Sequence, residues 1–179
     1  TMKTTEDSNF RAGFIAIAGA PNAGKSTLLN TMLGQKISIT SKKPQTTRDR
    51  ILGVVERPAA QVIFIDTPGI HKAKSLLNRK IVDQALSAVD DVDAILLMID
   101  VTSRDLESEA IIIEQLEKRN KEVILALNIT DLIKGNEVLP LIAHYSALYN
   151  FKAIIPVSAK TGAQTEDLLA EVEGCLPKG

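Results

Sequence analysis

Residues 19–27 read G-A-P-N-A-G-K-S-T and directly follow a short apolar run at residues 14–18. A strand that leads into G-x-x-x-x-G-K-S predicts a phosphate-binding loop, because the backbone N–H groups of such a loop point at the phosphates of a nucleotide. Residues 26–33 suit a helix, whose N-terminus adds partial positive charge beneath the phosphates. The alternative is a glycine-rich turn that contains Lys-Ser by chance, but it leaves the flanking strand and helix unexplained.

The loop residues expected to hold the nucleotide are Gly19, Pro21, Asn22, Ala23, Gly24, Lys25, Ser26 and Thr27. Lys25 is expected to reach the outer phosphates. The hydroxyl of Ser26 is expected to bind the Mg²⁺ that bridges those phosphates, since magnesium takes oxygen ligands.

The length of 179 residues, 45% of them hydrophobic, predicts one domain over residues 1–179 with a sizeable core. Residues 1–10 are expected to be a disordered leader or tag remnant, since Thr1 stands before Met2 and a polar segment follows. The net charge of -1 gives no general reason to expect nucleic-acid binding. The single cysteine, Cys175, excludes an intramolecular disulfide, and no apolar run approaches the ~20 residues of a membrane span.

The order of polar and apolar runs predicts an α/β domain. Two β-prone runs at 50–56 and 61–66, joined by turn-forming residues 57–60, are typical of an antiparallel hairpin. Further strands are expected at 94–100, 122–127 and 153–157, and helices at 76–89, 106–119, 137–149 and 164–175. Strand and helix alternate from residue 94 onward, which predicts parallel pairing with helices on both faces of the sheet. The polar segment 35–50 is expected to be a long loop.

Two aspartates and one short string follow other strands of the predicted sheet. Asp66, followed by Thr-Pro-Gly, ends a strand where its carboxylate can face a bound Mg²⁺; the alternative is a carboxylate that only caps a turn. Asp131 can accept hydrogen bonds from N1–H and N2–H₂ of guanine, whereas adenine leaves that carboxylate badly paired. In the string Ser158, Ala159 and Lys160, a backbone N–H can meet the guanine O6.

Together these motifs resemble those of the translation-factor-like branch of the GTPases, and within it the bacterial Era family. The matching segments are 19–27, P-Q-T-T-R at 44–48, D-T-P-G-I-H-K at 66–72, Asn128 with Asp131, and S-A-K at 158–160. They span nearly the whole chain. The string at 66–72 is particularly similar to that of the Era family, whereas the phosphate loop alone suits many GTPases.

The resemblance implies a P-loop GTPase G-domain with a six-stranded, mainly parallel sheet, one antiparallel strand and helices on both faces. It implies a first switch loop at 35–50 and a second from Gly69 to about residue 77. Thr47, with its neighbour Thr46 as the alternative, would bind Mg²⁺ in the GTP state together with Ser26 and Asp66. The backbone N–H of Gly69 would contact the γ-phosphate, and loss of that phosphate would release both loops.

Three positions or segments depart from what related GTPases carry. Ile70 stands where Ras-like GTPases have the glutamine that orients the attacking water, and its side chain can form no hydrogen bond. Related GTPases with an asparagine at the position of Asn22 can use K⁺ beside the phosphates, which is the implied substitute here. Ile129 stands where the family has a lysine that covers guanine and ties to the phosphate loop, so weaker nucleotide binding is expected. Era family members also have a C-terminal KH-type domain that binds 16S rRNA, and no residues of 1–179 are left for it.

The predicted function is that of a GTP-binding switch that slowly hydrolyses GTP, with catalysis resting on Asn22, Lys25, Thr47 and Gly69. By resemblance the switch takes part in small ribosomal subunit assembly in the cytoplasm, where peripheral membrane association is a further implication. One alternative is a regulatory module that holds a nucleotide with negligible turnover. Another is a P-loop ATPase or kinase, against which Asp131 argues.

Overall fold

The computed structural model describes residues 9–19, 30–31, 51–67, 78–102, 104–129, 135–158, 161–162 and 164–178. Its strands are β1 (Arg11–Gly19), β2 (Ile51–Arg57), β3 (Ala60–Asp66), β4 (Ala94–Asp100), β5 (Glu122–Asn128) and β6 (Ala153–Val157). Its helices are α2 (Arg79–Ser87), α3 (Leu106–Glu117), α4 (Gly135–Leu148) and α5 (Thr165–Gly174). Residues 30 and 31 are also helical, within the predicted helix that follows the phosphate loop.

The strands form one six-stranded sheet in the order β2-β3-β1-β4-β5-β6. β1 pairs in parallel with both β3 and β4, and the pairs β4–β5 and β5–β6 are also parallel. Only β2 runs antiparallel, against β3, in the hairpin that turns at Pro58 and Ala59. The predicted fold class is therefore confirmed, and the strand that precedes the phosphate loop lies in the middle of the sheet.

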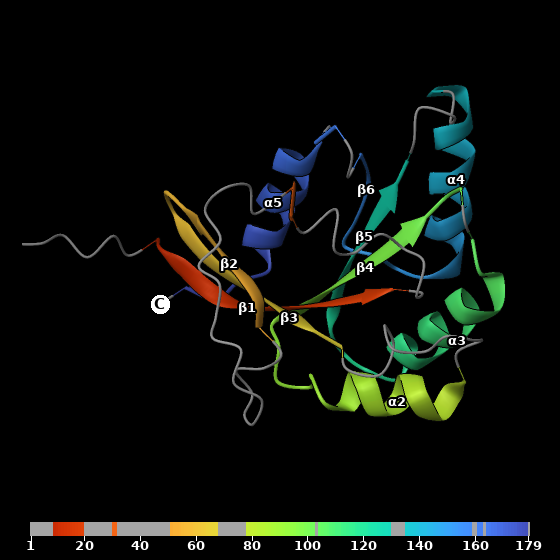
Figure 1. Cartoon of the computed structure of the whole chain (residues 1–179), viewed down its shortest axis with the longest axis horizontal. Helices are drawn as coiled ribbons and strands as arrows, with labels where there is room; N and C mark the ends of the chain where they lie inside the picture. The colour runs from red at the N-terminus through yellow and green to blue at the C-terminus, as the bar shows by residue number, and fades with distance from the viewer. Residues whose placement is uncertain are drawn as a thin grey trace, which may run out of the picture.

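Helices cover both faces of the sheet (Figure 1). Each face has its own apolar cluster. On one face, Leu168 and Val172 of α5 pack with Ile15 and Ile17 of β1. On the other face, residues of α2, α3 and α4 pack with Ala16 and Ala18 of β1 and with the alternate positions of β4 and β5. β4 and β5 are buried over almost their whole length, as expected of strands with helices above and below them.

The start of α2 differs from the predicted one because a capping residue intervenes. α2 begins at Arg79 rather than at residue 76, because the Asn78 side chain accepts a 2.9 Å hydrogen bond from the Ile81 N–H. Asp105 caps α3 in the same way, by accepting from the Ser108 N–H at 3.1 Å. None of the helices in the part of the chain that the structure describes is long and apolar enough to cross a membrane.

Ion pairs fasten the hairpin to α5, and hydrogen bonds fasten the start of β1 to the residues at the end of α5 and just after it. The Arg57 guanidinium at the hairpin turn bonds Glu166 and Glu173 of α5, and these contacts raise its pKa and lower that of Glu166. Arg11 at the start of β1 donates to the carbonyls of Gly174 and Leu176, at 3.3 and 3.1 Å. The edge of the sheet at β2 is therefore held to the last helix.

Candidate nucleotide site

The carboxyl ends of the parallel strands meet along one edge of the sheet, where α/β proteins bind their ligands. Gly19 ends β1 there, Asp66 ends β3, Asn128 ends β5, and Ser158 directly follows β6. These are the points at which the sequence places the phosphate loop, the magnesium carboxylate and the two guanine-binding segments. The structure therefore brings the starting residue of each predicted segment to the same edge.

Asp66 and Thr67 end β3 beside the strand of the phosphate loop. The Thr67 N–H donates to Asp66 Oδ1 at 2.9 Å, and the Thr67 hydroxyl donates to the Ile17 carbonyl of β1 at 2.9 Å. Thr67 is fully buried, whereas Asp66 is partly exposed. The carboxylate thus lies at the rim of the site, next to a buried contact between β3 and β1.

Asn128 and its neighbours join three strands at the same edge. Asn128 is buried at 9% exposure, and its backbone carbonyl accepts from the Val101 N–H just after β4. The next residue, Ile129, donates its N–H to the Val157 carbonyl of β6 at 2.8 Å. This hydrogen bond fixes the backbone of Ile129, and the residue is partly buried.

The loop after β6 is held by its own side chains. The Ser158 hydroxyl accepts from the Thr161 N–H at 3.1 Å, and the Ser158 carbonyl accepts from the Gly162 N–H at 2.8 Å. Gly162 has a φ of 79°, a conformation that side-chain-bearing residues rarely adopt, and a Cβ added there would lie 3.4 Å from the Thr31 side chain. Thr31 follows the phosphate loop in sequence, so the helix after that loop and the loop after β6 lie close together.

The other predicted site residues lie outside the described residues. They are Pro21, Asn22, Ala23, Gly24, Lys25, Ser26, Thr27, Thr47, Gly69, Asp131, Ala159 and Lys160. The switch loops and Ile70 lie there too. Their predicted roles therefore stay predictions.

The donor set suits magnesium rather than a transition metal. Ser26 and Thr47 would supply hydroxyl oxygens and Asp66 a carboxylate oxygen, which are the hard ligands that Mg²⁺ takes, usually one or two beside phosphates and waters. Within the described ranges, no group of three or more His, Cys, Asp or Glu side chains gathers that could hold a metal by itself. A nucleotide would therefore have to complete the coordination of the ion.

A second polar cluster lies between α3 and α4. Glu109, buried at 6% exposure, accepts from the Tyr145 hydroxyl at 2.5 Å and from Arg104 at 3.3 Å. Burial, and then the contacts with Glu109, raise the pKa of Tyr145 well above its ordinary value. The Arg104 guanidinium also lies over the Tyr145 ring, 5.1 Å from its centre. This cluster fastens α4 to α3 and carries none of the predicted site residues.

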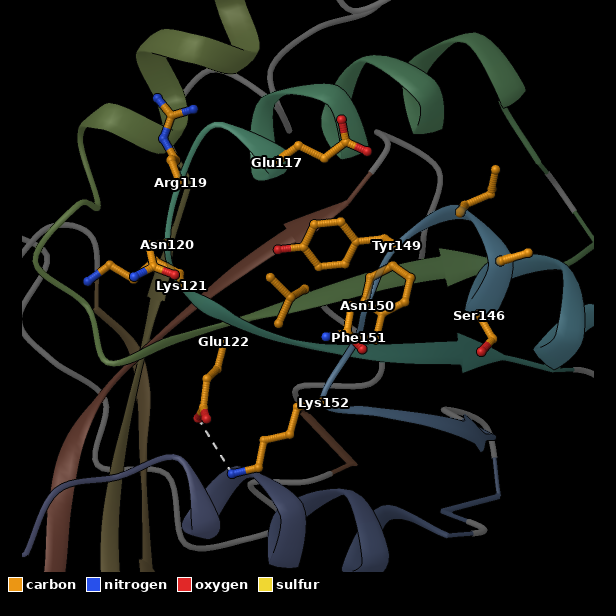
Figure 2. A pocket seen from close by; sticks show the side chains of 13 residues that line it. Glu117, Arg119, Asn120, Lys121, Glu122, Ser146, Tyr149, Asn150, Phe151 and Lys152 are labelled. Carbon is orange, nitrogen blue, oxygen red and sulfur yellow. Dashed lines mark hydrogen bonds and ion pairs between the residues drawn. The ribbon is translucent and has the colours of Figure 1, made fainter.

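A hollow of about 1160 Å³ opens at the opposite edge of the sheet, between the start of β5 and the segment that leads into β6 (Figure 2). Tyr149 and Phe151 lie side by side in it, with ring centres 4.9 Å apart. Lys152 pairs with Glu122 at 3.5 Å along its wall. The hollow therefore lies at the amino ends of these strands, away from the predicted nucleotide site.

The sequence did not single out Thr67, which the structure places between Asp66 and β1. Its type is unremarkable in a Thr-Pro-Gly turn, and no spacing rule marks a threonine beside a predicted metal ligand. The one available signal was that a β-branched, polar residue follows an aspartate that is predicted to bind Mg²⁺ at the end of a strand.

Comparison with known proteins adds independent information. The family described as "50S ribosome-binding GTPase" matches residues 14–129. The protein named GTPase Era of Geotalea uraniireducens is 49% identical over 97% of this chain, and that of a Geobacter species (strain M21) is 52% identical over 97%. This chain spans 58% of the length of each of these relatives.

Solved structures with a similar fold include two of Era. A crystal structure of Era in complex with MgGDPNP and nucleotides 1506–1542 of 16S ribosomal RNA superposes with a TM-score of 0.74 at 41% identity, and covers 95% of this chain and 58% of that one. A variant of Aquifex aeolicus Era bound to GDP and AlF₄⁻ gives a TM-score of 0.73 at 41% identity, with the same coverage. The chain therefore belongs to the 50S ribosome-binding GTPase family, and GTPase Era is a member that it resembles over nearly its whole length.

Proposed function

We propose that this chain binds GTP with Mg²⁺ at the carboxyl edge of its sheet and slowly hydrolyses it to GDP and phosphate. The observation that carries the proposal is the convergence of Gly19, Asp66, Asn128 and Ser158 at that one edge, each next to a motif that the sequence shares with GTPases. In the reaction a water oxygen bonds to the γ-phosphorus as the bond to the β–γ bridging oxygen breaks.

The phosphates and the ion would be held by the loops after β1 and β3. Lys25 would neutralise charge on the outer phosphates, and Ser26 and Asp66 would hold Mg²⁺ in both nucleotide states. Thr47 and the Gly69 N–H would engage only when the γ-phosphate is present. Loss of that phosphate would release both switch segments, which makes hydrolysis a signal.

The base would be read by the loops after β5 and β6. Asp131 would accept from N1–H and N2–H₂ of guanine, while the segment of Ser158, Ala159 and Lys160 would offer a backbone N–H to O6. The buried Asn128 and Ser158 support this arrangement, because backbone hydrogen bonds fix both at the ends of neighbouring strands.

Potassium is the proposed substitute for the missing water-orienting glutamine. The oxygen of Asn22 would help to hold K⁺ beside the phosphates, where the ion neutralises charge that develops in the transition state. Hydrolysis should then be faster in potassium than in sodium, and Asn22→Ala should remove the difference. Equal rates in the two salts, with Asn22→Ala behaving like the parent in both, would exclude this role.

The small ribosomal subunit is the proposed partner of the switch, in the cytoplasm. The support is the 41% identical Era that was crystallised with a segment of 16S ribosomal RNA. This chain spans 58% of the length of that relative, and the KH-type domain that the resemblance implies would make the RNA contacts. The nucleotide state of the present domain would govern those contacts.

Phosphate release from GTP in the presence of Mg²⁺ tests the proposal, with Lys25→Ala as the matched control. Release well above that control is expected. Release equal to the control, with GTP still bound, would instead favour a regulatory module that holds nucleotide without turnover. ATP that competes as well as GTP would indicate an adenine-nucleotide enzyme and overturn the assignment.

A further inference from the structure

We propose that Thr67 is a positioning residue for magnesium, which joins the Asp66 carboxylate to the strand that enters the phosphate loop. The inference rests on the proposed function, because it concerns the same ion. It adds a residue to which neither the motifs nor the comparisons give a role.

Thr67 makes two hydrogen bonds that point in different directions. Its hydroxyl donates to the carbonyl of Ile17 in β1, and its backbone N–H donates to Asp66 Oδ1, both at 2.9 Å. Thr67 and Ile17 are both at 0% exposure, so water cannot take the place of the hydroxyl. One residue therefore holds the neighbouring strand and the carboxylate at once.

The place of these bonds in the sheet explains their effect. Ile17 and Asp66 are the last paired residues of β1 and β3, and Ile17 lies two positions before Gly19, where the phosphate loop begins. The Thr67 hydroxyl extends the contact between the two strands by one residue beyond that pair. The end of β3 is thus fixed relative to the start of the phosphate loop.

The fixed position of β3 relative to β1 is important for binding Mg²⁺. The ion demands near-octahedral geometry at short distances, and its proposed ligands come from separate loops, with Ser26 after β1 and Asp66 at the end of β3. A small shift of β3 relative to β1 changes the distance between those ligands. The Thr67 N–H also limits rotation of the Asp66 side chain, so both the position and the direction of the carboxylate depend on this residue.

The test compares Thr67→Val, which replaces the hydroxyl by a methyl group, with Thr67→Ser, which keeps it. Release of a fluorescent GDP is followed as MgCl₂ is titrated, and again in EDTA. The magnesium midpoint is the Mg²⁺ concentration at which the slowing of GDP release is half-maximal. Thr67→Val should raise this midpoint about tenfold, which is the equivalent of one lost hydrogen bond. Thr67→Ser should stay within about twofold of the parent, and release in EDTA should be the same for all three proteins.

A merely structural role predicts a different pattern. Thr67→Val would then speed GDP release in EDTA and in MgCl₂ by the same factor, and that result overturns the inference. An unchanged magnesium midpoint in Thr67→Val overturns it as well. If Thr67→Val does not fold, Thr67→Ala is titrated in its place with the same expected midpoint. If the parent chain releases GDP equally fast with and without MgCl₂, the proposed magnesium site and this inference fail together.

Discussion

The two edges of the sheet carry polar side chains in opposite ways. At the carboxyl edge, Thr67, Asn128 and Ser158 are each at most 9% exposed. At the amino edge, one polar pair that lines the hollow, Lys152 with Glu122, is exposed, with side chains that are 30% and 56% exposed. Buried polar groups must be hydrogen-bonded, so they are held in place, whereas exposed pairs contribute little. The predicted nucleotide site thus lies at the edge where polar groups are buried and held by hydrogen bonds, and not beside the hollow.

The largest effect is expected at the carboxyl edge, from Asp131→Asn. An asparagine would turn its amide donor toward a donor of guanine, so GDP affinity should fall about a hundredfold, while ADP remains a poor ligand. Xanthosine diphosphate is the matched control, since its carbonyl replaces the 2-amino group and suits an amide donor. Unchanged GDP binding in isothermal calorimetry would remove Asp131 from the site.

Ile129→Lys is the next change, and it should strengthen binding. In the proposed site Ile129 would cover part of the guanine ring but could not form the charged tie to the phosphate loop that the resemblance implies for a lysine at this position. A lysine should recover about 2 kcal/mol, which is more than tenfold in GDP affinity, with no loss of the preference for guanine over adenine. Equal dissociation constants for the two proteins would show that Ile129 replaces the lysine fully.

Much of the fold, and the edge of the sheet that carries the predicted site, could be predicted from the sequence. Apolar runs bounded by turn residues gave five of the six strands to within a residue or two, and alternation with helices predicted their parallel pairing. The carboxyl edge as the ligand edge then follows from the rule for parallel sheets. The sixth strand was also predicted, but β1 begins at Arg11, three residues before the apolar run that predicted it.

Long-range contacts could not be predicted in this way. The hydrogen bond from Thr67 to Ile17 joins residues far apart in sequence, and neither residue type signals it. The pairing of Glu109 with Tyr145 is likewise set by how α3 and α4 pack. The start of α2 at Arg79 could have been predicted, because Asn78 is a strong capping residue. The prediction instead followed the helical spacing of apolar residues and placed the start at residue 76.

At the amino edge, Cys175 should be an unreactive thiol. Burial raises its pKa from 9.0 to about 11, so far less thiolate is present at pH 8 than in a free cysteine. Iodoacetamide should modify Cys175 about tenfold more slowly than a small thiol, with the rate still rising near pH 11. Because the folded pKa is the higher one, the contribution of this thiol to stability is present below about pH 9 and lost as the pH rises toward 11. Modification as fast as that of a free thiol would show that burial does not raise the pKa of Cys175.

The smallest effect is expected from Glu122→Gln, also at the amino edge. The change removes one exposed ion pair with Lys152, so the free energy of unfolding should change by less than about 1 kcal/mol. GDP affinity should not change, because the pair lies at the opposite end of β5 from Asn128. Calorimetry and urea unfolding of the variant measure both quantities. A clear loss of nucleotide binding would mean that the amino edge takes part in the site.

A crystal structure of this chain with GDP and Mg²⁺ tests the contrast between the two edges most directly. We expect the nucleotide at the carboxyl edge, with guanine on Asp131, phosphates in the loop after Gly19, and Mg²⁺ beside Ser26 and Asp66. Electron density for the nucleotide in the hollow between Glu122 and Phe151, or a guanine ring that does not contact Asp131, would contradict it.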